Sequence, residues 1–230
     1  MAKLVWDALG EHFYETGVDH VVLYRLDANN AYTKGYAWNG VSSISESPSG
    51  GDANPIWADN IKYLNLRAVE EYGSTIECYT YPDEFAECNG EGQPASGIAI
   101  GQQTRKTFGL SYRTIVGNDA SGNDYGYKLH LVYGCTASPS EKSYSTVNDS
   151  PEAGTFSFEL STVPVAVPGY KNTALLTIDS TKFTTAQMTA LETLLYGGEG
   201  QNADAQLPTP ETVLTTLGLT YDEQTGKWSA

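Results

Sequence analysis

Residues 57–85 constrain the fold more than any other part of the chain. They combine two strand-like runs, 61–66 and 75–81, with a short acidic turn, and they hold no cluster of catalytic side chains. In the second run Ile76 and Cys78 point one way and Glu77 and Tyr79 the other, as successive residues of a strand do. This segment therefore predicts β structure and no active site.

Short runs rich in Val, Ile, Thr, Tyr and Phe recur over most of the chain, bounded by Gly, Pro, Asn or Asp. They predict further strands at 20–26, 35–38, 41–46, 98–101, 106–116, 127–133, 155–161 and 173–179. Asn39-Gly40 is a tight-turn dipeptide, so strands 35–38 and 41–46 are expected to form a hairpin. Residues 82–88 predict a single helical turn. The chain is therefore expected to be mainly β.

Residues 47–55 lie between two of these strands and are rich in Gly, Pro and Ser. They have no apolar period, which predicts a long exposed loop. A loop of this length inside a compact domain is usually functional or disordered.

The last 50 residues have a different pattern. Residues 184–195 place Met188, Leu191, Leu194 and Leu195 at helical spacing behind a Thr184 cap. Residues 199–206 are expected to be a flexible linker, 210–218 a second short helix and 221–228 a closing hairpin. We therefore expect a β domain over 1–182 and a helical C-terminal extension over 183–230, packed on that domain or on a neighbour.

The sequence has no nucleophile elbow G-x-S-x-G, no P-loop, no G-x-G-x-x-G after a strand and no H-E-x-x-H, so no enzyme and no cofactor are predicted. The acidic pairs Asp83-Glu84 and Glu70-Glu71 resemble glycosidase carboxylates only in kind, because adjacent residues on a turn diverge. The Asp-rich turns 27–30 and 119–124 lack the ligand spacing of a calcium loop.

The cysteines and histidines give no metal signature. Cys78, Cys88 and Cys135 have no C-x-x-C spacing and are expected to be small buried side chains. A disulfide between Cys78 and Cys88 would require an oxidising compartment. The three histidines are scattered, so no metal site is predicted.

The chain is strongly acidic, with 13 Lys and Arg against 28 Asp and Glu and a formal net charge of −15. General phosphate binding is therefore not expected, because it requires clustered basic residues. The charge fits either a soluble surface or a pore through which DNA slides without sticking. No apolar run is long enough for a transmembrane helix, and the first residues lack the apolar core of a signal peptide, so synthesis in a cytoplasm is expected.

Four segments resemble the major tail (tail tube) proteins of siphophages. They are Gly17-Val-Asp-His-Val-Val-Leu-Tyr with the later Gly40-Val-Ser-Ser-Ile-Ser-Glu-Ser-Pro-Ser-Gly, then Trp57-Ala-Asp-Asn-Ile-Lys-Tyr-Leu, Tyr79-Thr-Tyr-Pro-Asp-Glu-Phe, and Phe156-Ser-Phe-Glu-Leu-Ser-Thr-Val-Pro-Val-Ala-Val. The resemblance covers most of residues 5–180, and its specificity comes from the order and spacing of the segments.

The resemblance implies a β-sandwich or half-barrel of the phage tail tube type with peripheral C-terminal helices. It implies a structural virion protein of the phage tail, assembled in the host cytoplasm into hexameric rings that stack into a tube. The partners would be further copies of the chain and the tape-measure and tail-terminator proteins, with DNA only in transit through an acidic lumen. Wall strands are expected within 61–81 and 106–133, with Lys106, Arg113 and Lys128 pointing away from the lumen.

Contacts between subunits or rings are expected at residues of the 47–59 segment, where Ile56 and Trp57 supply apolar anchors. The candidates are Pro48, Asn54, Pro55, Ile56, Trp57 and Asp59. Two other classes stay open: a non-enzymatic β-sandwich module for carbohydrate or cell-surface recognition, and an enzyme with a carboxylate site.

Overall fold

The computed structural model of the protein describes residues 4, 6–146, 149, 153–198 and 204–229. They form an eight-stranded antiparallel sheet in the order β2-β1-β11-β12-β13-β8-β3, with β14 also paired to β12. The strands are β1 (Phe13–Arg25), β2 (Lys34–Ala37), β3 (Val41–Glu46), β8 (Gly73–Cys78), β11 (Phe108–Asn118), β12 (Gly122–Ala137), β13 (Phe156–Thr162) and β14 (Leu175–Asp179). The prediction of a mainly β fold with a large antiparallel sheet and few helices is confirmed, and the fold is consistent with a β-sandwich or half-barrel.

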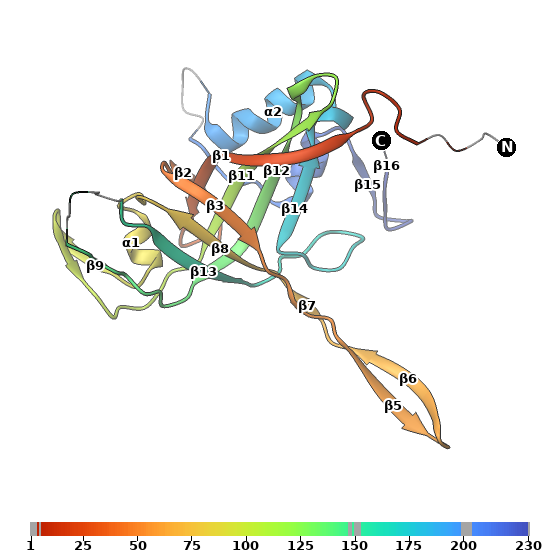
Figure 1. Ribbon diagram of the computed structural model, residues 1–230, viewed down its shortest axis with the longest axis horizontal. Coiled ribbons are helices and arrows are strands. Elements are labelled where there is room, and N and C mark those ends of the chain that lie inside the picture. The colour runs from red at the N-terminus through yellow and green to blue at the C-terminus, as the bar shows by residue number, and fades with distance from the viewer. Residues whose placement is uncertain (1–3, 5, 147–148, 150–152, 199–203, 230) are drawn as a thin grey trace.

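Strand β12 joins two branches of this sheet (Figure 1). Along one edge it pairs first with β14, over Lys128–Val132, and then with β13, over Cys135–Ala137. Gly134 lies between the two ladders with φ +63°, and a Cβ there would lie 2.2 Å from the carbonyl oxygen of Val163. Only glycine fits this bend, which lets the sheet change direction.

The expected hairpin at Asn39-Gly40 is wrong. The chain turns there, with Gly40 at φ +78°, but β2 pairs with β1 and β3 pairs with β8. These pairings lie at opposite ends of the strand order, so the turn connects the two ends and the sheet curls into an open barrel. The indole of Trp38 donates to the carbonyl of Thr80, 2.9 Å away, across this junction.

Two apolar cores lie on the two faces of the curled sheet. Because side chains alternate along a strand, Val21 and Leu23 of β1 enter the inner core while Val22 and Tyr24 enter the outer one. The inner core is aromatic and includes Trp38, Phe85, Phe108 and Phe158, with α1 (Phe85–Cys88) closing one end. The outer core lies between the sheet and helices α2 (Thr185–Tyr196) and α3 (Pro210–Thr216).

The C-terminal elements follow the sequence prediction closely. Thr184 caps α2 and forms a reciprocal capping box with Gln187. A 3₁₀ turn (Ser180–Lys182) precedes α2, and β15 (Thr220–Asp222) and β16 (Lys227–Ser229) form the closing hairpin. Of the expected linker 199–206, residues 199–203 lie outside the described part of the chain.

Two smaller groups of strands complete the fold. Strands β9 (Gly92–Ala95) and β10 (Ile98–Ile100) form a peripheral hairpin. Strands β4 (Ser49–Gly50), β5 (Ala53–Ala58), β6 (Ile61–Arg67) and β7 (Glu70–Glu71) form an extension between β3 and β8.

Cys78, Cys88 and Cys135 are buried and free, as expected for small apolar side chains. No helix among the described residues is long and apolar enough to cross a membrane.

Candidate assembly surface

A long β-hairpin leaves the sheet between β3 and β8 and projects away from the body (Figure 1). We call residues 49–71 the arm. Strands β4 and β7 pair at its base, and β5 and β6 pair beyond them. Asp59 and Asn60 form the tip with φ of +52° and +63°, which are the signs that a type I′ hairpin turn requires.

The expectation of a loop at 47–55 is therefore wrong over most of its length. Ser49–Gly50 and Ala53–Ala58 are strands, because residues 61–71 supply a ladder that the local sequence does not reveal. Pro55 lies opposite Asn65 in this ladder. A two-stranded arm has two free edges, and a strand edge is where a proline is tolerated.

The arm exposes apolar side chains on both of its faces. The register pairs Ile56 with Leu64 and Trp57 with Lys62, with a shift between the two pairs, and the successive residues Ile56 and Trp57 point to opposite faces. Leu64 shares the face of Ile56, and Trp57 occupies the other face. Trp57 is 65% exposed, Tyr63 66% and Ile61 62%. An isolated two-stranded hairpin is only marginally stable in water, so this surface fits a segment that is covered by a partner.

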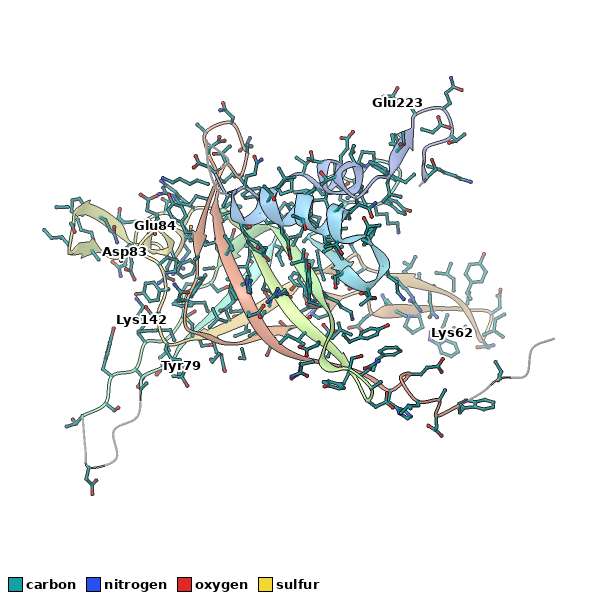
Figure 2. All side chains as sticks on the ribbon, turned by 90° about the horizontal axis from the view of Figure 1, so that it is seen from above. Lys62, Tyr79, Asp83, Glu84, Lys142 and Glu223 are labelled. Carbon is teal, nitrogen blue, oxygen red and sulfur yellow. The ribbon has the colours of Figure 1, made fainter. Side chains whose placement is uncertain are left out.

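Charge sets the outer part of the arm, residues 51–69, apart from the rest of the molecule, whereas Glu70 and Glu71 at its base give the whole arm a charge of −2. Residues 51–69 hold two acids, Asp52 and Asp59, and two bases, Lys62 and Arg67, so the segment is net neutral in a chain of net charge −15. Figure 2 places Lys62 on the arm, far from the acidic pair Asp83 and Glu84 beside α1. A neutral segment can approach a like-charged copy with less repulsion than the body can.

Hydrogen bonds fix the residues on either side of the arm to the body; we call these residues, 46–48 and 72–73, the arm root. The amide of Ser47 donates to the carbonyl of Gly73 at 2.8 Å, and the Thr162 hydroxyl donates to the carbonyl of Tyr72 at 2.7 Å. The hydroxyl of Tyr112 on β11 donates to the Glu46 carboxylate at 2.5 Å. Both legs of the arm are thus tied to the sheet.

Four of the six predicted contact residues, Asn54, Pro55, Ile56 and Trp57, lie on β5, while Asp59 is at the tip and Pro48 precedes β4. All six are exposed, and their role in contacts between subunits stays a prediction. The sequence predicts the facing strand 61–66 but not its exposed side chains as contact candidates, and Ile61, Tyr63, Leu64 and Leu66 are all exposed. The signal in the sequence was the run 61–66 itself, which has apolar residues at both odd and even positions, as in a strand that is covered on both faces.

The N-terminal segment is a second exposed apolar element. Leu4, Trp6 and Leu9 are each more than two thirds exposed. The segment is tied to the β11–β12 turn, where Asp119 accepts from the backbone amide of Gly10 at 3.0 Å. It projects from the body on the same side of Figure 1 as the arm.

The acidic groups that sequence analysis singled out do not converge. Asp83 is exposed at the start of α1, and Asp27 accepts from the amides of Asn29 and Ala31 as a local turn. Lys106 and Arg25 lower the pKa of the Glu87 carboxyl, while burial raises the pKa of the Cys88 thiol to about 11. Among the described residues, no three His, Cys, Asp or Glu side chains gather as metal ligands.

No protein-family model and no curated protein matches the sequence. Among solved structures, the chain is similar to a chain in the "Cryo-EM structure of the anti-feeding prophage (AFP) baseplate, 6-fold symmetrised". The two share 10% sequence identity with a TM-score of 0.32, over 76% of this chain and 97% of the other. This likeness assigns no function to the chain.

Proposed function

We propose that the protein is a phage structural subunit that assembles with copies of itself into hexameric rings stacked as a tail tube. The observation that carries this proposal is the arm: its outer part, residues 51–69, is net neutral, projects from an acidic body, and exposes apolar side chains on both faces. The number six and the tube come from the sequence resemblance to tail tube proteins. The arm supplies the surface that such an assembly requires.

The sheet itself also favours assembly. Within the described residues, β14 pairs only with β12, so it leaves one edge without a ladder partner. Open edges favour association with another chain, and closure of a ring removes them. Head-to-tail contacts of this kind form a ring when the rotation between copies closes.

The pairing of basic side chains supports an acidic channel. Lys106 forms an ion pair with Glu87 at 2.7 Å, Arg113 with Asp19 at 2.7 Å, and Lys128 with Glu15 at 2.5 Å. Each of these three cations on or just before the expected wall strands β11 and β12 is therefore matched by a carboxylate. DNA phosphates would meet few uncompensated positive charges there. The other expected wall span, 61–81, begins with β6, which belongs to the arm and not to the large sheet.

Electron microscopy and analytical ultracentrifugation of the purified chain test the proposal. We expect rings or tubes from the natural sequence. The matched variant replaces residues 54–66 by Asn-Gly, because Ala53 and Arg67 already face each other and a two-residue turn can join them. This variant should remain a folded monomer. A control variant changes Ile98 and Ile100, exposed apolar residues of β10, to serine and should still assemble.

The same measurement separates the alternatives. A natural chain that stays monomeric at high concentration and in high salt contradicts the proposal. A monomer that binds glycans would instead favour the β-sandwich recognition module.

A further inference from the structure

His130 lies beneath the arm root, on the inner face of β12, and is only 7% exposed. Its ring stacks on Tyr112 with centroids 4.6 Å apart and planes 3° from parallel. The ionisable groups around it come from several elements: Glu15 of β1, Glu46 of β3, Tyr72 before β8, Tyr112 of β11 and Lys128 of β12, whereas β14 places Thr177 opposite it.

Hydrogen bonds determine which ring nitrogen carries the proton. The Thr114 hydroxyl donates to Glu15 at 2.6 Å, so its oxygen accepts from the Nε2–H of His130 at 3.0 Å. The other nitrogen, Nδ1, is buried without a hydrogen-bond partner and lies 3.5 Å from a Glu46 oxygen. Nε2 therefore carries a proton, and Nδ1 is a buried nitrogen without a hydrogen-bond partner beside a carboxylate.

The same stack holds both legs of the arm. The Tyr112 hydroxyl bonds Glu46, the last residue of β3, and lies 3.3 Å from the hydroxyl of Tyr72. Glu15 and Glu46 belong to β1 and β3, which share no ladder in the described chain. His130 thus lies at a seam between two unpaired strands, and a cavity of about 240 Å³ lined by residues such as Val18 and Ile44 lies along it.

The electrostatic balance favours the neutral ring in the closed seam. Burial lowers the pKa of His130 from its ordinary 6.5, against the opposite effects of Glu46 and Glu15. Lys128 already donates a hydrogen bond to Glu15, so the positive charge of Lys128 offsets part of the attraction between Glu15 and a protonated His130. A closed seam therefore binds this proton more weakly than an open, hydrated one. By linkage, the closed seam is fully stable at a pH above the ordinary histidine pKa of 6.5, and its stability declines as the pH falls below 6.5.

We propose that His130 is a pH-sensitive latch: its protonation opens the seam between β1 and β3 and releases the arm root. Water entering along the cavity solvates the charged ring. The stack on Tyr112 then loosens, and with it the contacts that Tyr112 makes to Glu46 and Tyr72. The latch belongs to the single chain and does not depend on tube formation.

Hydrogen exchange of the full chain, held monomeric at low concentration, tests the latch. One titrating group with an open-state pKa near 6.5 changes the opening equilibrium by at most about tenfold between pH 7.5 and 5.5. After correction for intrinsic rates, we expect the Ser47 amide at the arm root to lose up to about tenfold of its protection. Amides in the β12–β14 ladder, such as Leu131, should keep theirs.

Variants and a titration complete the test. His130→Asn and His130→Phe should abolish the pH dependence at Ser47, while His12→Asn, at an exposed histidine, should preserve it. Imidazole resonances of the natural chain should show His130 titrating below pH 6.5, together with the loss of protection. Unchanged or increased protection at pH 5.5, a loss that persists in a folded His130 variant, or a His130 that titrates above 6.5 would each overturn the proposal.

Discussion

Truncation of Trp57 separates an assembly role for the arm from a folding role. A tryptophan side chain offers roughly 200 Å², so 65% exposure leaves about 130 Å² to be covered by a partner. At ~25 cal/mol per Å² this burial contributes about 3 kcal/mol per contact. Trp57→Ala should therefore raise the concentration needed for tube growth by about a hundredfold. The free energy of unfolding of the monomer should change by less than about 0.5 kcal/mol.

Light scattering and sedimentation over a concentration series measure the first quantity, and urea unfolding of the monomer measures the second. Tyr144→Ala is the matched control, because Tyr144 is an aromatic residue with 83% exposure that lies outside the arm. Growth of tubes by Trp57→Ala at the natural concentration would refute the reasoning. So would a large loss of monomer stability, because it would give Trp57 a role within the fold.

Two further predictions concern the body. Gly134→Ala should lower the free energy of unfolding by more than ~2 kcal/mol, since left-handed backbone costs roughly 1–2 kcal/mol for alanine and the new Cβ meets the Val163 carbonyl. The control is Gly101→Ala, where the space is open. Equal unfolding midpoints for the two variants would contradict the prediction. The Arg113 hydrogen bonds lower the pKa of Asp19 below 3.8, so this pair stabilises the fold above that pH and the contribution is lost as the pH falls through the lowered value. Asp19→Asn should flatten the acid limb of the urea-unfolding profile, and an unchanged limb would count against the pair.

Local sequence patterns predict the strands and helices well but not how the strands pair. The alternation at 155–161 and the helical spacing of Met188, Leu191 and Leu195 each report a face that is buried in the structure. The Asn39-Gly40 turn was predicted, yet its flanking strands pair with β1 and β8. Pairing across the sheet depends on partners far away in sequence, and a dipeptide carries no information about them.

The arm shows the same limit at the candidate site. Gly and Pro between 47 and 55 indicated a loop, because the ladder from residues 61–71 is invisible to a local reading. Ile56 and Trp57 were identified as apolar anchors, and both are exposed. Tyr63 and Ile61 were read as part of a wall strand, since alternation alone does not tell a strand that faces a core from one that faces solvent.

The ladder between β1 and β11 has a consequence for the order of folding. It joins Phe13 to Asn118 and Arg25 to Phe108, so its strands are separated by on the order of a hundred residues, a long-range closure that slows folding. During synthesis β1 must wait for β11, with Val21–Tyr24 uncovered until the sheet forms. At high chain concentration this stage would allow the first strand to pair with the wrong copy.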